Sequence, residues 1–183
     1  MPKAILQRSL GITALSLMIV GALPSSASAE EGELSLSAGV TAARWSDPRD
    51  GSSLLDSGVT LGMTWWFTDF WSGAVRLRGA STVTGEDAPS PIVGGDLEAR
   101  YVLDALTWVP WACAGVGGSW GDHEGPGGVT AALVHAGLGM DYRPSRSWSV
   151  ALSARYRVAI TDLERTSGPM ELTVGFRFYP QGP

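Results

Sequence analysis

The stretch that most constrains the fold of this chain lies near its C-terminus. Residues 170–179 read Met-Glu-Leu-Thr-Val-Gly-Phe-Arg-Phe-Tyr, so apolar and polar side chains alternate with a period of two. A β-strand places successive side chains on opposite faces, so this strand has one apolar face and one polar face. Such a strand fits a soluble sheet whose apolar face meets a second sheet. It also fits a transmembrane barrel whose apolar face meets lipid.

The rest of the chain repeats the same alternation and favours the barrel. We predict seven further strands, at residues 33–44, 58–67, 72–82, 93–103, 108–120, 129–142 and 148–160. The strand at 108–120 has the weakest signal, because Pro110 and a run of small residues blur its alternation. Charges recur on the polar face, as Arg76 and Arg78 do, which suits a barrel with lipid outside and a polar interior.

The connections between these strands alternate in length. Long connections follow the first, third, fifth and seventh strands, and short turns follow the second, fourth and sixth. In outer-membrane barrels the long loops are extracellular and the short turns periplasmic, so we expect both termini in the periplasm. The predicted fold is therefore all-β, an eight-stranded antiparallel up-and-down transmembrane β-barrel.

The N-terminus has the three parts of a secretory signal peptide. Lys3 and Arg8 precede an uncharged apolar run at residues 9–23, and the small residues that follow end in Ala27-Ser28-Ala29. We predict a cleavable signal peptide at 1–29 and a barrel domain at 30–183. An uncleaved anchor is the alternative, although an apolar run of about 15 residues is short for a membrane-spanning helix.

Charge and cysteine content exclude several classes of function. The chain has 13 Lys and Arg against 18 Asp and Glu, a net charge of −5, and loss of Lys3 and Arg8 would make it −7. This balance argues against a nucleic-acid partner. The single cysteine, Cys113, excludes an internal disulfide and offers no metal-binding cluster, so we expect it to be a small packing residue. We predict no cofactor and no metal site.

The signal peptide, the eight alternating segments and the terminal Phe176-Arg177-Phe178-Tyr179 resemble the small eight-stranded outer-membrane barrels of the OmpA and OmpX type. This resemblance implies an outer-membrane location in a Gram-negative cell envelope. It also implies outer-membrane lipid, lipopolysaccharide and the assembly machinery as partners. Members of that family usually end on the aromatic residue that the machinery reads, whereas here Pro180 to Pro183 follow Tyr179. Soluble lipocalin-like barrels are the architectural alternative, with the polar face outward.

Two sets of residues follow from the predicted barrel. Leu172, Val174, Phe176 and Phe178 should face lipid from the C-terminal strand. The interior should hold a charge network with a sum of +2, and because an eight-stranded barrel is just wide enough for side chains, these charges must pair. We expect a salt-bridged plug, and the alternative is an anion channel lined by arginine. The predicted lumen network comprises Arg76, Arg78, Asp96, Glu98, Arg100, Asp141, Arg155, Arg157, Glu171 and Arg177.

No catalytic residue is predicted. Barrel enzymes that deacylate lipid A use a His and a Ser two residues apart on one strand, but Leu133 and Gly137 occupy those positions around His135. Asp122-His123-Glu124 carries ligands suited to a divalent ion, yet glycines flank it and we interpret it as a solvated loop.

Tryptophans and acids mark the expected ends of the barrel. The eight tryptophans lie mostly near strand ends, which predicts two aromatic girdles, with sugar stacking as the alternative. An acidic extracellular rim could bind divalent cations that bridge it to lipopolysaccharide phosphates, or could only keep the loops solvated. The rim acids are Asp47, Asp50, Asp56, Glu86, Asp87, Asp122, Glu124, Asp162 and Glu164.

Together these patterns predict a non-enzymatic, integral outer-membrane barrel with a structural or surface-interaction role. A narrow, porin-like passage for small solutes or hydrophobic molecules is the alternative, and a lipid-modifying enzyme is the third hypothesis. The extracellular ligand is left open.

Overall fold

The computed structural model describes residues 32–46, 53–83, 90–103, 107–121, 131–161 and 167–180, so the predicted signal peptide lies outside the described residues. No helix in these segments is long and apolar enough to cross a membrane. The strands are β1 (Leu34–Ser46), β2 (Ser53–Trp66), β3 (Trp71–Val83), β4 (Ser90–Val102), β5 (Trp108–Gly121), β6 (Ala131–Tyr142), β7 (Trp148–Ala159) and β8 (Ser167–Phe178).

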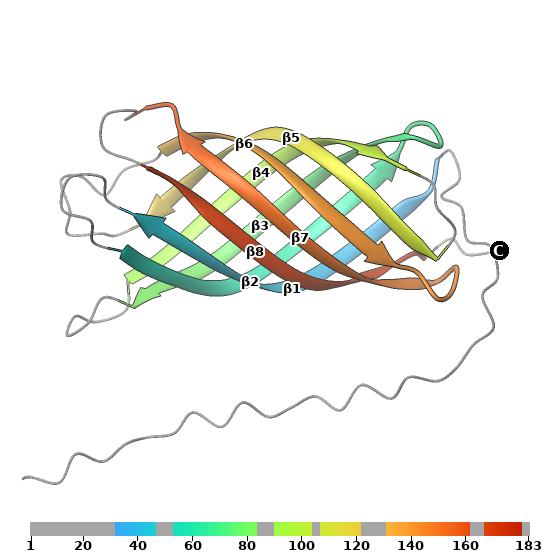
Figure 1. The fold of residues 1–183 in the computed structure, drawn as a ribbon, viewed down its shortest axis with the longest axis horizontal. Helices are drawn as coiled ribbons and strands as arrows, with labels where there is room; N and C mark the ends of the chain where they lie inside the picture. Colours follow the sequence, from blue (N-terminus) through green and yellow to red (C-terminus); the bar gives the residue numbers. More distant parts are fainter. Residues whose placement is uncertain are drawn as a thin grey trace, which may run out of the picture.

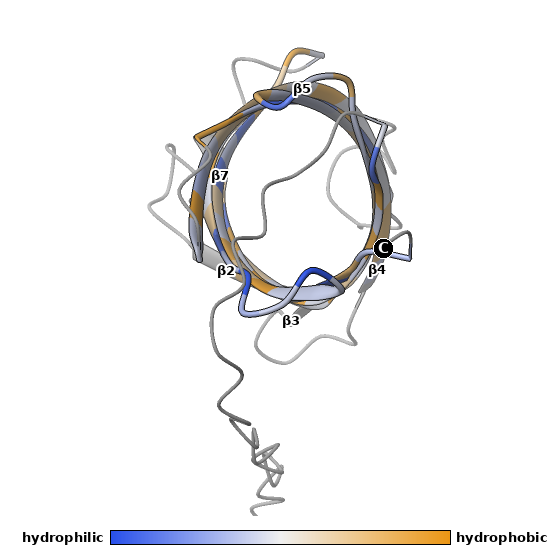
Figure 2. Cartoon of the chain, turned by 90° about the vertical axis from the view of Figure 1, so that its right-hand side faces the viewer, coloured by the Kyte–Doolittle hydropathy of each residue, from blue (hydrophilic) through white to orange (hydrophobic). Residues whose placement is uncertain are grey.

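The eight strands form one closed barrel (Figure 1). Each strand is antiparallel to the next, and β1 also pairs with β8, so the sheet has no free edge. Along its axis the barrel is an oval ring (Figure 2). The predicted eight-stranded up-and-down fold is confirmed.

The largest boundary difference is in β2, which begins at Ser53 and not at residue 58. Pairing explains the extension, because β1 continues to Ser46 and lies opposite Ser53. The extension places Asp56 inside the barrel, where the residue is 0 % exposed. Our assignment of Asp56 to the acidic rim was therefore wrong. The other rim acids and the Asp122-His123-Glu124 motif lie outside the described residues.

The strand register sets the width of the barrel. From Arg44 on β1 the paired residues pass once around the sheet and return to β1 at Leu34, ten residues away. A shear of ten over eight strands implies a strand tilt of about 40° and a radius of about 8 Å. The residues on this path are Arg44, Met170, Tyr156, Ala136, Ala114, Ala99, Gly73, Trp65 and Leu34.

The apolar face of every strand points outward. Leu77 is 60 % exposed, whereas its neighbours Arg76 and Arg78 are 5 % and 4 % exposed. The predicted lipid-facing residues of β8 also lie on the outer surface, with exposures between 47 % and 51 %. A soluble lipocalin-like barrel needs the opposite arrangement, so that alternative is wrong. Those β8 residues are Leu172, Val174, Phe176 and Phe178.

The short turns and both ends of the described chain lie at one end of the barrel, which we call the turn end (Figure 1). The opposite end, where β1 runs into β2 and β3 into β4, is the loop end. At the turn between β2 and β3 the Thr68 hydroxyl accepts hydrogen bonds from the amides of Phe70 and Trp71, at 3.3 and 3.0 Å. These capped amides keep the connection short.

Exposed aromatic rings gather at the turn end and form a girdle there. The ring pairs are Trp65 with Phe67, Phe70 and Trp71 with Tyr101, Trp108 with Tyr142, and Trp148 with Phe176.

The tryptophan prediction needs two corrections. At the loop end Trp120, 56 % exposed, is the outward tryptophan among the described side chains, so a second complete girdle is not seen in the described part of the chain. Trp66 and Trp111 lie inside the barrel, at 3 % and 5 % exposure. Both occupy inward positions of the strand alternation, which outweighs their position near strand ends.

Candidate functional site

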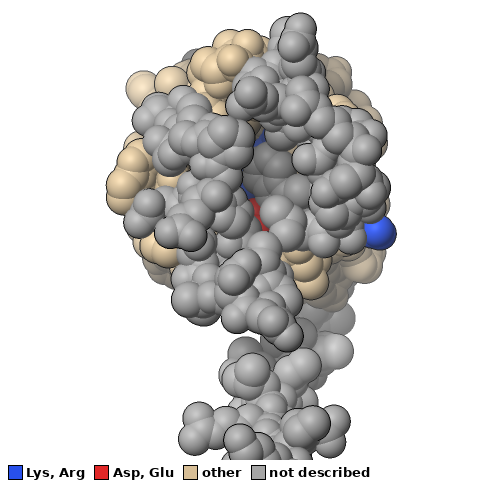
Figure 3. All heavy atoms as spheres, turned by 90° about the vertical axis from the view of Figure 1, so that its left-hand side faces the viewer, with Lys and Arg blue, Asp and Glu red and all other residues tan. Residues whose placement is uncertain are grey.

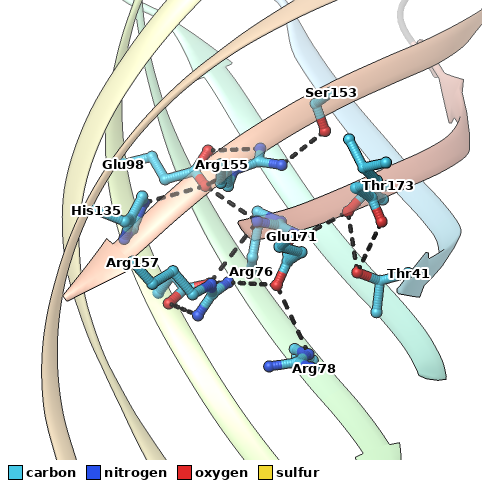
Figure 4. A network of polar contacts seen from close by, with 12 residues as sticks. Thr41, Arg76, Arg78, Glu98, His135, Ser153, Arg155, Arg157, Glu171 and Thr173 are labelled. Atoms are coloured by element: carbon cyan, nitrogen blue, oxygen red, sulfur yellow. Dashed lines mark hydrogen bonds and ion pairs between the residues drawn. The ribbon is translucent and has the colours of Figure 1, made fainter. Parts of the chain in front are cut away.

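The candidate site is the lumen. All ten charged residues predicted for it lie inside the barrel, and each is at most 5 % exposed. They come from β3, β4, β6, β7 and β8. Figure 4 shows how side chains from these strands converge. Asp56 and His135 also lie inside the barrel. Asp56 lowers the formal sum of the described lumen charges from +2 to +1; this sum leaves out Arg143 and Glu33, which pair with each other at the turn end.

Ion pairs join opposite walls in the half of the lumen nearer the loop end. Arg157 on β7 donates to both oxygens of Asp96 on β4, at 3.0 and 2.7 Å, and lies 3.0 Å from Glu171. Arg76 on β3 bridges Glu98 at 3.2 Å and Glu171 at 3.1 Å. Seen from the loop end, blue and red atoms of charged side chains are visible inside the barrel (Figure 3). The guanidinium groups therefore span the cross-section.

Glu98 is the hub of the network. Its carboxylate accepts hydrogen bonds from Arg155 at 2.7 Å, from Arg100 at 2.8 and 3.0 Å, and from Arg76 at 3.2 Å. The His135 Nε2 atom lies 3.3 Å from the same carboxylate. One buried carboxylate thus accepts hydrogen bonds from three guanidinium groups and lies close to an imidazole.

A second cluster lies in the half of the lumen nearer the turn end. Asp141 accepts a hydrogen bond from Trp111 Nε1 at 2.9 Å and pairs with Arg177. The guanidinium groups of Arg100 and Arg155 lie 4.8 and 5.4 Å from the Trp111 ring centroid, within the range of cation–π attraction. Trp111 therefore links the Asp141 pair to the Glu98 hub.

Inward glycines on β5 and β6 make room for these large groups. A Cβ atom at Gly137 would lie 2.7 Å from the Arg155 Cγ, and one at Gly115 would lie 2.8 Å from the His135 ring. Both distances are below van der Waals contact. The small residues that blur the alternation at 108–120 thus leave space for the side chains of the network.

A smaller cluster closes the turn end, and we call Glu33, Arg143 and Tyr179 the turn-end lock. Arg143 donates to Glu33 at 2.8 Å and to the Arg146 carbonyl at 3.1 Å. Its guanidinium lies 3.8 Å from the centroid of the Tyr179 ring. Tyr179 is 2 % exposed, and its amide donates to the Ser147 carbonyl at 2.9 Å. The lock therefore ties both ends of the described chain, at Glu33 and Tyr179, to the turn between β6 and β7.

Sequence reasoning missed this lock for a clear reason. Arg143 and Glu33 lie just outside their strands in the structure, and the alternation at 170–179 places Tyr179 with the polar, inward set without indicating a partner for it. Phe178 is the outward residue at that point, and Tyr179 turns inward. A shallow pocket opens next to the lock and is lined by Trp66, Asp69, Val102, Val109, Asp141, Arg143 and Tyr179.

Catalytic and metal chemistry find little support in the described residues. No group of three or more His, Cys, Asp or Glu side chains in these segments could hold a metal ion. The His135 side chain is fully buried against Glu98, and Leu133 and Gly137 are its neighbours along the inner face. Cys113 is a buried free thiol that faces the lumen.

Comparison with known proteins places the fold in a class. No protein-family profile matches the chain, and no curated sequence matches it. Several solved structures share the fold, and they are small outer-membrane β-barrels. Neisserial surface protein A has a TM-score of 0.64 at 14 % identity, over 79 % of this chain and 96 % of that chain.

Two more solved structures show how varied this class is. The outer membrane protein OprG from Pseudomonas aeruginosa has a TM-score of 0.58 at 13 % identity, over 84 % of this chain and 98 % of that one. The outer membrane enzyme PagL has a TM-score of 0.52 at 15 % identity, over 76 % and 98 %. At these identities the likeness shows the fold alone.

Proposed function

We propose that this protein is an integral outer-membrane barrel with a closed lumen and a structural or surface-interaction role. The network that joins opposite walls through Glu98 and Glu171 carries this proposal. In a barrel of about 8 Å radius, measured to the backbone, we expect guanidinium groups that reach across the lumen to block a continuous water path.

Three observations support the outer-membrane location. The outer face is mainly apolar, the network charges lie inside, and the structures that share the fold are outer-membrane barrels. On this proposal the partners are outer-membrane lipid, lipopolysaccharide in the outer leaflet, and the assembly machinery. Phe176 and Phe178 are the outward aromatic residues that the machinery would meet on β8.

The same site argues against an enzyme. His135 is the histidine among the described residues, and its imidazole faces the carboxylate that also binds three arginines. A general base must reach a substrate proton within hydrogen-bond distance. The plug on one side and the barrel wall on the other keep a lipid substrate away from this ring.

Conductance tests the closed lumen. The folded protein in a planar bilayer should carry no steady current, whereas an Arg76→Ala/Glu171→Ala variant, which removes one cation and one anion together, should conduct. A Leu77→Ala variant at the neighbouring outward position is the control and should stay silent. A steady current through the unmodified protein would contradict the plug and favour the alternative, a passage for small solutes or hydrophobic molecules.

Fractionation tests the location separately. The protein should enter the outer-membrane fraction and should migrate faster in detergent gels before heating than after heating. Recovery from the soluble periplasm would contradict the membrane assignment, whatever the bilayer experiment shows.

A further inference from the structure

The half of the lumen nearer the turn end holds more cations than its carboxylates can neutralise. Among the described residues Arg100 and Arg155 both have Glu98 as their carboxylate partner, and Arg76 shares it. Asp141 is occupied by Arg177 and by Trp111. The formal surplus of +1 in the described lumen therefore falls on the group around Arg100.

Buried polar atoms that have no partner lie on the wall beside this surplus. In the described part of the chain the hydroxyls of Ser35 and Ser72 and the Trp66 Nε1 atom have no hydrogen-bond partner. Ser35 and Ser72 are each 1 % exposed, and Trp66 is 3 % exposed. A buried donor that is left without a partner destabilises the folded state, so these groups favour a bound acceptor.

The register places these atoms side by side along one arc of the inner wall. Ser35 on β1 lies opposite Thr64 on β2, Trp66 lies opposite Ser72 on β3, and Ser72 lies opposite Arg100 on β4. Directly opposed residues on one face have Cβ atoms about 5 Å apart.

Two arginines flank this arc. Arg100 reaches back along it and donates to the Thr64 hydroxyl at 3.1 Å, which leaves the Thr64 hydrogen free to donate. On the other side Arg177 of β8 lies opposite Ser37, the next inward residue after Ser35. The arc therefore presents hydroxyl, indole and guanidinium donors. The carboxylates that adjoin it are already paired, Glu98 with Arg100, Asp141 with Arg177, and Glu33 with Arg143.

We propose that this arc binds one small monovalent inorganic anion of the halide class. The anion would accept hydrogen bonds from Ser35, Thr64 and Ser72 and would lie between the guanidinium groups of Arg100 and Arg177. It neutralises the surplus charge around Arg100, for which the described residues supply no further carboxylate. Hydrogen-bonded water could satisfy the same hydroxyls but would leave the surplus charge in place.

Unfolding under controlled anion composition tests this site. The full folded protein in detergent is heated in sodium gluconate, whose anion is too large for the lumen, and in sodium bromide at equal ionic strength. Bromide should raise the unfolding temperature. A Ser35→Ala/Ser72→Ala variant should bind bromide about tenfold more weakly or worse, as expected from the loss of two hydrogen bonds of ordinary strength.

The chain offers a matched control on the opposite face. Ser57 and Ser81 are cross-strand neighbours on β2 and β3 whose side chains point outward, so Ser57→Ala/Ser81→Ala should keep the full bromide response. An equal response in both double variants would place the bromide elsewhere and overturn the proposal.

Diffraction from the unmodified protein gives a readout that does not depend on the variants. Crystals grown in bromide should show an anomalous peak between Arg100, Arg177 and Ser72. Absence of that peak, together with identical unfolding temperatures in bromide and gluconate, would mean that water alone fills the arc.

Discussion

The outer and inner faces of β4 require different kinds of side chain, although their residues alternate along the strand. On the outside Leu97 is 59 % exposed, whereas its neighbour Glu98 is 4 % exposed and binds three arginines. The outer face needs only apolar side chains, because it meets lipid. The inner face needs particular residues, because each carboxylate must meet particular cations.

This difference predicts where substitutions should change the stability of the barrel. A change outside that keeps the residue apolar alters only contact with a fluid solvent. A change inside strands a charge or fills space that another side chain uses. The following experiments compare the two faces, and stability in all of them means the free energy of unfolding in lipid vesicles.

The largest effect is expected at the hub. Replacement of Glu98 by Leu leaves Arg100 and Arg155 without their carboxylate and removes one of the carboxylates that bind Arg76, so stability should fall by about 3–5 kcal/mol. Denaturant unfolding of Glu98→Leu beside Leu97→Ala measures the contrast, and Leu97→Ala should lose far less. Equal losses at the two positions would contradict a packed ionic interior.

A charge on the outer face comes next. Leu97→Arg places a guanidinium in the hydrocarbon region and should cost about 2–4 kcal/mol near the bilayer midplane. Leu97→Val keeps the class of side chain and should change little. If Leu97→Arg were neutral in vesicles, that face would not meet lipid.

A single methyl group tests the inner packing. Gly137→Ala would bring a Cβ atom to 2.7 Å from Arg155 and should cost about 1–3 kcal/mol through overpacking. Gly79→Ala on the outer face is the control, because no atom lies within 4 Å of a Cβ built there. The same Cβ atom would lie 2.6 Å from the Ala154 carbonyl oxygen, so a neutral result at Gly137 would contradict a tightly packed inner wall.

The smallest effect is expected at the turn-end lock. Tyr179→Leu removes the ring beneath Arg143 and should cost about 0.5–2 kcal/mol, the range of a cation–π contact. Phe178→Leu, one residue earlier and outward, should cost less. The same denaturant titrations distinguish the two, and the reverse order would mean that the lock adds no stability.

Much of this architecture could be predicted because period-two alternation reports on one strand at a time. It identified eight strands and the inward charges such as Glu98 and Arg157 without any knowledge of their partners. Asp56 and His135 could have been added to the network by the same rule, since both occupy inward positions on their strands. Asp56 lies before the predicted strand at 58–67, which places it with the acidic rim, and the sequence suggests His135 only as a catalytic base.

The rest depended on contacts between strands, which alternation does not encode. The pairing of Arg157 with both Asp96 and Glu171 follows from shear and tilt. The positions of Trp111 under two arginines and of Tyr179 under Arg143 follow from the same geometry. Small residues on β5 weaken the alternation because they lack large side chains. For the same reason they leave space for side chains from neighbouring strands.

The seam between β1 and β8 has a consequence for how the chain reaches this state. It joins residues that are far apart in the sequence, such as Thr41 and Leu172, which are 131 positions apart. The first strand therefore keeps an unpaired edge until the last strand has been synthesised, and exposed strand edges invite pairing with other chains. Closure is then a single late event that converts two hazardous edges into one hydrogen-bonded ladder, so the chain must be protected from aggregation for the whole of its synthesis and export.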